Sequence, residues 1–380
     1  MVEILFVLGV LAAVFVGINI GGSSTGVAFG PAVGSRLLSK HRAAALMTFF
    51  VFLGGWTVGR NVISTMGGKI VPASQFSMTA SVIILFFVGL SLLISNLSGV
   101  PASTSMTAVG AIAGLGIATG TLDWEVMGRI VSWWLVAPAV AFLAGGAIGR
   151  YLYVHMDEFF HIDQSSGDLL RYRKGVPAGL GPGTSGRELV SSLLVLGIAC
   201  YMAFSAGASN VANAVAPLVG SKALMMEPAI LLAVAAIGVG SFTIARKTLA
   251  TVGDGITELP LLAALVVSTV SATIITGLSA MGIPASLAIS ATMCITGLGW
   301  GRASRTVRLR DTLQGEAPPM KAAALQAGDR KEIGEESEED LPDRRLFNPD
   351  TIRHVVTMWI LTPAISAAAS FTVFYGLQLL

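Results

Sequence analysis

Four landmarks of this chain occur twice and in the same order, which constrains its fold more than any other feature. GGSSTGVAFGPAVGS, from Gly21, matches FSAGASNVANAVAPLVG, from Phe204. GRNVISTMGGKI, from Gly59, aligns with ARKTLATVGDGI, from Ala245. The other two pairs are GVPASTSMTAVGAIAG with GIPASLAISATMCITGLG, and WLVAP with WILTP. The recurrence predicts a tandem duplication, with two structural repeats in one chain.

The composition places both copies in a membrane. Of the 380 residues, 53% are hydrophobic and only 12% are charged, whereas about 25% charged residues is usual for soluble domains. Apolar runs near the length of a membrane span recur along the chain. We therefore predict an all-α polytopic membrane protein with two inverted-topology repeats and broken or re-entrant helices. The predicted divisions are a first repeat at 1–152, a cytoplasmic linker at 153–187, and a second repeat at 188–380 with a charged cytoplasmic loop at 302–350.

The orientation follows from the placement of lysine and arginine. Basic loops occur at 36–42, 150–187 and 302–310, and the positive-inside rule puts them in the cytoplasm. The amino and carboxyl termini are then external, and each half crosses the cell membrane an odd number of times, which inverts one repeat relative to the other. The acidic run at 329–343 is expected to be a solvated loop, and a surface segment without a specific role is its simplest interpretation.

Each half carries two polar motifs at membrane depth. The glycine-led motifs are expected to break their helices, and the G-x-P-A-S motifs are expected to start helices inside the membrane. Helix starts offer free amides and positive dipole ends, which attract anions. The alternative is that these small residues only allow close helix packing. The candidate substrate-binding residues are Gly22, Ser23, Ser24, Thr25, Ser103, Thr104, Ser105, Ser209, Asn210, Asn213 and Ser286.

A second group of residues is a candidate for coupling or gating. It consists of Arg60, Thr65, Arg246, Thr251 and Asp254. The arginines would neutralise an anion or stabilise a gate, but snorkelling from helix ends explains them equally well. Asp254 is a candidate for cation or proton coupling, with interfacial capping as the alternative. The recurring tryptophan and proline pairs are expected to lie on kinked packing helices rather than in the site.

Several other function classes lack support in the sequence. No basic stripe suggests a nucleic-acid partner. The two cysteines lie in apolar segments and the four histidines in or beside polar loops, so a metal cluster in the membrane is not supported. The membrane segments lack a constellation of nucleophile and base, which argues against an enzyme. No cofactor is expected, and the partners are an inorganic oxyanion and the lipid bilayer.

The motifs resemble those of the inorganic phosphate transporter (PiT) family over nearly the whole chain. That family carries G-A-N-D-V-A-N in both halves, which stands here as GASNVAN from Gly207 and GGSSTGV from Gly21. Its P-V-S-T-T-H-like motif stands here as PASTSM and PASLAI, with Met106 and Ile289 in place of histidine. The resemblance implies an ion-coupled anion symporter with a duplicated, inverted fold.

Both aspartates of the family signature are absent and are replaced by Ser24 and Asn210. Phosphate at neutral pH still carries a proton that it can donate to a carboxylate, whereas sulfate carries none and would meet unpaired like charge. The sequence therefore favours sulfate over phosphate and looks like the sulfate permease branch of the family. A phosphate symporter and a passive anion channel are the alternatives. Coupling to sodium or to protons stays open, as does the oligomeric state, for which a homodimer is one alternative.

Overall fold

The computed structural model describes residues 2–35, 37–97, 103–160, 170–173, 176–180, 186–245, 260–306 and 349–378. These residues form helices and a short antiparallel hairpin. In chain order the elements are α1 (Val2–Gly34), α2 (Lys40–Trp56), α3 (Gly59–Met66), the 3-10 turn Ala73–Gln75, α4 (Met78–Leu97), α5 (Thr104–Ala118), α6 (Trp124–Ala147), the π-helical turn Ile148–Leu152, α7 (Tyr153–Phe160), β1 (Leu170–Arg173), β2 (Val176–Leu180), α8 (Gly186–Gly220), α9 (Met226–Phe242), α11 (Leu261–Ala280), α12 (Leu287–Ala303), the 3-10 turn Ser304–Thr306 and α14 (Pro349–Gln378).

The helices confirm a multi-pass membrane protein. Within the described residues, six helical segments are long and apolar enough to cross a membrane. A seventh crossing results if α2 and α3, which meet at a bend of 62°, form one broken span. The helices α5 and α9 are apolar but shorter, with 15 and 17 residues, as expected for helices that begin or end inside the bundle.

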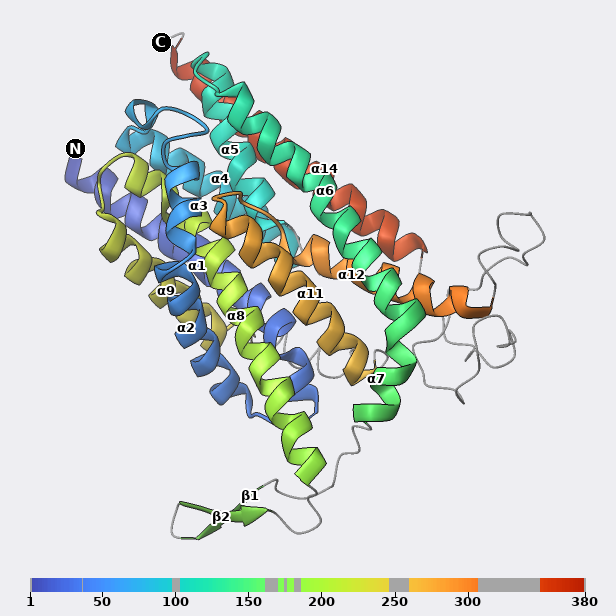
Figure 1. The fold of residues 1–380 in the computed structure, drawn as a ribbon. Coiled ribbons are helices and arrows are strands. Elements are labelled where there is room, and N and C mark those ends of the chain that lie inside the picture. Colours follow the sequence, from blue (N-terminus) through green and yellow to red (C-terminus); the bar gives the residue numbers. More distant parts are fainter. Residues whose placement is uncertain are drawn as a thin grey trace, which may run out of the picture.

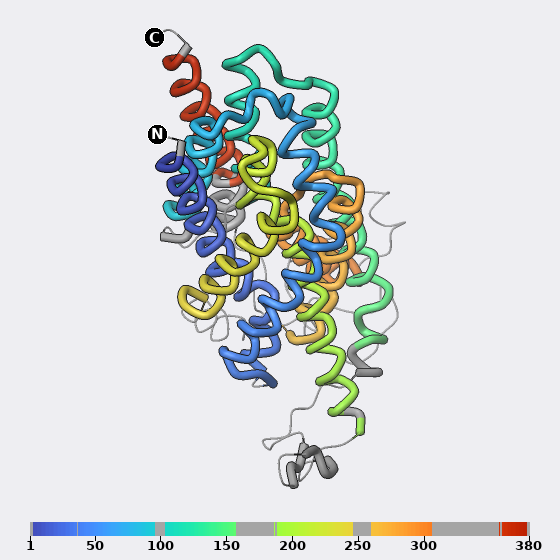
Figure 2. Tube along the Cα trace, turned by 90° about the vertical axis from the view of Figure 1, so that its left-hand side faces the viewer, coloured from blue at the N-terminus to red at the C-terminus, as the bar shows by residue number. Residues whose placement is uncertain are grey.

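The two longest helices, α1 and α8, pack against each other at the centre, and each also packs against helices of the other half (Figure 1). The helix α1 contacts α9, and α8 contacts α2. Likewise, α5 packs on α14, and α12 packs on α6. Figures 1 and 2 both show α1 and α8 running in opposite directions. This exchange of partners is what inverted repeats would produce, and the two-fold relation itself stays a prediction.

The prediction that the glycine-led motifs break their helices is wrong. Gly21 lies within the continuous helix α1, and Gly207 lies within the continuous helix α8. A Cβ on Gly21 would stand 2.0 Å from the Ile237 carbonyl oxygen, and one on Gly207 would stand 2.3 Å from the carbonyl oxygen of Val51. These glycines allow backbones to approach closely. The expected four helix ends therefore reduce to two helix starts, those of α5 and α12.

The starts of α5 and α12 lie where the two G-x-P-A-S motifs predict them. Ser103 is the N-cap of α5, and its Oγ accepts the backbone N–H of Met106 at 3.2 Å. Ser286 is the N-cap of α12 and accepts from Ile289 in the same way at 3.3 Å. Both serines are buried. The two motifs thus build the same local structure, a capped helix start inside the protein.

Removing one of these caps gives a measurable loss of stability. We expect Ser286→Ala to lower the free energy of unfolding by about 1 kcal/mol, because the substitution leaves the N–H of Ile289 without its acceptor. Thermal unfolding in detergent measures the change. Ser290→Ala is the matched control, since Ser290 is buried in the same helix but does not cap it. Equal unfolding midpoints for the two variants would contradict the capping role.

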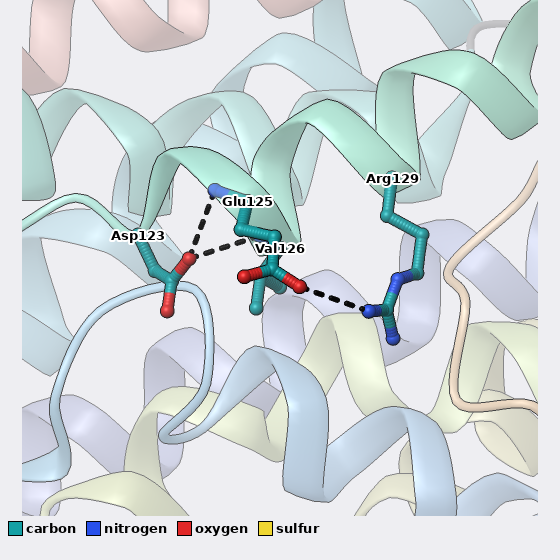
Figure 3. Close-up of polar contacts among 4 residues, drawn as sticks. All are labelled: Asp123, Glu125, Val126 and Arg129. Atoms are coloured by element: carbon teal, nitrogen blue, oxygen red, sulfur yellow. Dashed lines mark hydrogen bonds and ion pairs between the residues drawn. The ribbon is translucent and has the colours of Figure 1, made fainter.

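The start of α6 has a different cap, at the surface. The Asp123 carboxylate accepts the backbone N–H groups of Glu125 at 3.0 Å and Val126 at 2.9 Å (Figure 3). Arg129 and Glu125 add an exposed ion pair one turn further, at 3.4 Å. These contacts fix where α6 begins, and α6 carries Trp134 to the site described below.

The predicted linker is partly helical. From α6 the helix continues through the π-helical turn into α7, and it passes the predicted boundary at residue 152 before it ends at Phe160. The side chain of Tyr153 is fully buried, because it packs in an apolar group with residues such as Ala141 and Leu298. Most of the charged loop at 302–350, including the acidic run at 329–343, lies outside the described residues.

Candidate functional site

A group of uncharged polar side chains lies where α8 meets α1 and the start of α5. Thr104 of α5 donates from Oγ1 to Oδ1 of Asn210 at 2.7 Å. Nδ2 of Asn213, one turn along α8, lies 3.2 Å from Oγ1 of Thr104 and 3.2 Å from Oγ of Ser105. Asn210 and Asn213 are 7% and 1% exposed. We call this group the polar cluster, and its members are Ser24, Thr104, Ser105, Ser209, Asn210 and Asn213.

Ser209 connects the polar cluster to the start of α12. Its hydroxyl lies 2.8 Å from the carbonyl oxygen of Ala285, to which it donates, and 3.2 Å from Oγ of Ser105. The side chain of Ser209 is fully buried. The two helix starts, one from each half of the chain, are therefore joined through a single hydroxyl of α8.

Ser24 and Asn210 face each other across the interface of α1 and α8. Nδ2 of Asn210 donates to Oγ of Ser24 at 3.5 Å, a long hydrogen bond. These two residues occupy equivalent positions of the duplicated glycine-led motif. The structure thus brings together the two positions at which the PiT signature has aspartate.

The electrostatic character of the polar cluster favours an anion. Its members are hydroxyls and carboxamides, which donate hydrogen bonds without adding charge. Thr104 is the first residue of α5, and Ala285 precedes the first turn of α12, so both contacts are made at helix starts. The amides of a helix start and its dipole carry partial positive charge. Neutral donors beside two helix starts therefore suit an oxyanion.

The polar cluster also contains an acceptor. Oδ1 of Asn213 is buried and has no hydrogen-bond partner within the described part of the chain. Leaving such an oxygen unpaired costs about 1–3 kcal/mol. A bound hydroxyl group or a small cation would satisfy it, so the cluster can contact a donor as well as an anion.

Three predicted substrate-binding residues of α1 point to other partners. A Cβ on Gly22 would stand 2.6 Å from the side chain of Ile244. The hydroxyl of Ser23 bonds back to carbonyls of α1. Thr25 donates to Gly21 of its own helix at 2.7 Å and lies 2.8 Å from Oγ of Ser241 on α9. Of the four predicted residues in α1, only Ser24 therefore joins the polar cluster.

The other predicted substrate-binding residues lie at the edge of the cluster. Ser103 and Ser286 stand directly before α5 and α12, where their hydroxyls accept backbone N–H groups as caps. Each hydroxyl oxygen already accepts one backbone N–H of its own helix, which leaves less of its hydrogen-bonding capacity for a ligand. Their contribution to the cluster is that they fix the first turns of the two helices.

The predicted gating residues that the structure describes lie on α3. Arg60 pairs with Glu227 of α9 at 3.0 Å, and its guanidinium carbon lies 4.6 Å from the centre of the Trp56 ring. Thr65 donates to the carbonyl oxygen of Asn61 at 3.1 Å. Neither residue contacts the polar cluster through a hydrogen bond among those described. Arg246, Thr251 and Asp254 lie outside the described residues.

The pair of Arg60 and Glu227 is expected to contribute little to stability. Its side chains are 33% and 52% exposed, and such ion pairs typically contribute about 0–1 kcal/mol. We expect Arg60→Gln and Glu227→Gln each to leave the thermal unfolding midpoint almost unchanged, because the pair is exposed to solvent. A double-mutant cycle with both substitutions measures the coupling. A coupling energy several times larger would show that the pair locks α3 to α9.

The sequence did not predict two side-chain contacts that hold the backbone before α12. The side chain of Asn61 donates from Nδ2 to the carbonyl oxygen of Ala280 at 2.9 Å, so α3 supports the turn that leads into α12. Trp134, expected only to pack, donates from its indole N–H to the carbonyl oxygen of Pro284 at 2.8 Å. The recurrence of a tryptophan in WLVAP and WILTP was the available signal. It did not identify the partner, which is 150 residues away.

Comparisons with known proteins agree with this architecture. The profile of the phosphate transporter family matches residues 20–370. The chain is 29% identical to the sulfate permease CysP of Bacillus subtilis, over 80% of each protein. It is 26% identical to a putative phosphate permease of Chlamydia muridarum, over 80% of this chain and 92% of that protein. A solved structure titled the sodium-dependent phosphate transporter shares the fold, with a TM-score of 0.70, 20% identity and 99% of each chain covered.

Proposed function

Because the chain belongs to the phosphate transporter family, we propose that it is a secondary active transporter that imports a tetrahedral oxyanion, and that its preferred substrate is sulfate. The proposed mechanism is ion-coupled alternating access by two inverted repeats. The proposed location is the cell membrane, with both termini external. The polar cluster is the proposed binding site.

The observation that carries the choice of sulfate is that the polar cluster, among the residues that the structure describes, contains no carboxylate. All six members are uncharged, and Ser24 and Asn210 lie in contact at 3.5 Å where the PiT signature has aspartates. A fully deprotonated dianion requires donors only, and a carboxylate in contact with it would add like-charge repulsion. Hydroxyl and amide donors avoid that repulsion. The similarity to a sulfate permease supports the same choice.

The helix starts inside the bundle favour a carrier over a passive channel. The two short helices α5 and α12 begin inside the bundle, as do the discontinuous helices of many secondary transporters, whose binding sites lie at helix ends near the midplane. A channel would instead need a continuous pore lined by polar groups. The paired helix starts therefore favour alternating access.

The acceptor atom of the polar cluster supports ion coupling. Oδ1 of Asn213, unpaired within the described residues, is an oxygen ligand of the kind that hard cations prefer. A coupling cation bound there would also offset the charge of the anion. The chemistry of the site admits either sodium or a proton carried by a water molecule, and the following experiment separates them.

Uptake into proteoliposomes tests the proposed function. We expect labelled sulfate uptake to saturate with concentration and to accumulate above equilibrium when an inward gradient of the coupling ion is imposed. Sodium and proton gradients are applied separately, and an ionophore that collapses the driving gradient should abolish accumulation. Uptake that never exceeds equilibrium under either gradient would contradict a secondary active transporter.

A further inference from the structure

The backbone that leads into α12 is held from two sides. The indole N–H of Trp134, on α6, donates to the carbonyl oxygen of Pro284 at 2.8 Å. The hydroxyl of Ser209, on α8, donates to the next carbonyl, that of Ala285, also at 2.8 Å. Ser286 then caps the helix. Two consecutive peptide groups thus take donors from two different helices, directly before the first turn of α12.

This arrangement links Trp134 to the polar cluster. Ser209 belongs to the cluster and lies 3.2 Å from Oγ of Ser105, which in turn lies 3.2 Å from Nδ2 of Asn213. A change in the position of the Pro284 peptide would move the adjoining Ala285 carbonyl, which is the partner of Ser209. Trp134 is therefore linked to the cluster through two hydrogen bonds and the covalent step from Pro284 to Ala285.

The ring of Trp134 packs against an apolar group to which both helix starts contribute. It packs in an apolar group with Met106 and Ile289, which occupy the same position in the first turns of α5 and α12, and with Trp359. Met106 and Ile289 are the residues whose backbone N–H groups are capped by Ser103 and Ser286. The ring thus packs against the apolar group that contains a residue from each helix start, while its N–H adds a directional bond to the backbone before α12.

We propose that Trp134 is a positioning residue for the oxyanion site: its indole N–H fixes the Pro284 peptide and so aligns the start of α12 with Ser209 and the polar cluster. The substrate part of this inference rests on the proposed function. The positioning part depends only on the geometry. Trp134 is assigned no contact with the substrate.

Trp134→Phe tests the inference, because it keeps an aromatic ring and removes the donor. We expect faster hydrogen–deuterium exchange of the backbone amides at 285–289, and an increase in KM for sulfate of about two- to tenfold, the range that the loss of one hydrogen bond gives, with the maximal uptake rate retained. Trp133→Phe is the matched control, since the neighbouring Trp133 packs against the main core. It should change neither quantity.

A second comparison uses the recurring tryptophan. The indole N–H of Trp359 is buried and has no hydrogen-bond partner among the described residues. Trp359→Phe removes no hydrogen bond among the described residues, so it should raise exchange at 285–289 less than Trp134→Phe does. If Trp134→Phe does not fold, 3-benzothienylalanine at position 134 replaces the N–H with sulfur in a ring of nearly the same shape.

The exchange measurement needs no substrate, so it separates this inference from the proposed function. Faster exchange at 285–289 without any sulfate uptake by the unsubstituted protein would support the positioning role and contradict sulfate transport. Unchanged exchange and unchanged KM in Trp134→Phe would overturn the inference. The same increase in Trp133→Phe would also overturn it, because a general loosening of α6 would then explain both.

Discussion

Asn210→Asp is expected to weaken sulfate uptake by at least about a hundredfold and to turn the preference of the protein towards phosphate. Two unit charges 4 Å apart interact by about 4 kcal/mol at an effective dielectric constant of 20, and each 1.4 kcal/mol is about a factor of ten in affinity. A carboxylate at position 210 would therefore repel a dianion strongly. A phosphate that carries a proton can donate that proton to the carboxylate instead.

The surroundings of Asn210 can accept this substitution. Oδ1 of Asn210 already accepts from Thr104 at 2.7 Å and from Nδ2 of Asn213 at 3.1 Å, and an aspartate oxygen would keep both bonds. The substitution removes only the donor that faces Ser24 at 3.5 Å. The protein is thus expected to stay folded, so that a change in selectivity can be measured.

The ratio of sulfate to phosphate uptake in proteoliposomes measures the effect. Asn19→Asp is the matched control, because Asn19 is a buried asparagine of α1, 3% exposed, whose side chain bonds to the carbonyl oxygen of Phe15. It introduces a buried acid outside the polar cluster and should leave the ratio unchanged. If Asn210→Asp transports sulfate with an unaltered preference, Asn210 only packs and the anion argument fails.

Gly207→Ala is expected to cause a large loss of stability. The added Cβ would stand 2.3 Å from the carbonyl oxygen of Val51 and 2.6 Å from its Cα, so α8 and α2 would have to separate. Overpacking of this kind costs about 1–3 kcal/mol and occasionally more, and the higher helix propensity of alanine returns at most about 1 kcal/mol. Because α8 carries three members of the polar cluster, the shift should impair uptake as well.

Gly197→Ala is the control for this prediction. Gly197 lies on the same helix, and a Cβ there would meet no atom within 4 Å, so only the gain in helix propensity remains. Thermal unfolding midpoints and the yield of monodisperse protein in detergent compare the two variants. Equal midpoints would show that α2 and α8 are not as closely packed as the structure indicates.

The helix starts could be predicted from sequence because their signal is local. A glycine, a proline and a serine cap are close together in the chain, with the proline two residues before the cap, and each has a marked conformational preference. The glycine-led motifs carry no such local signal. Glycine suits both a helix break and a close helix contact, and only the neighbouring backbones, those of Ile237 and Val51, decide between them.

The polar cluster could be predicted only in part, for a rotational reason. Ser23, Ser24 and Thr25 follow one another at about 100° around α1, so the three side chains cannot face one partner. The structure turns Ser24 towards α8 and Thr25 towards α9. The sequence does not fix this rotation, because small residues surround all three. On α8, Ser209 and Asn213 are four residues apart and therefore lie on one face of the helix.

The central claim is that a polar cluster without a carboxylate selects sulfate, and a competition assay with the purified protein in liposomes tests it most directly. Labelled sulfate and labelled phosphate are offered separately, each against an excess of the other, unlabelled anion. We predict saturable sulfate uptake that excess phosphate inhibits only weakly, and little phosphate uptake. Robust phosphate uptake that excess sulfate does not reduce would contradict the claim.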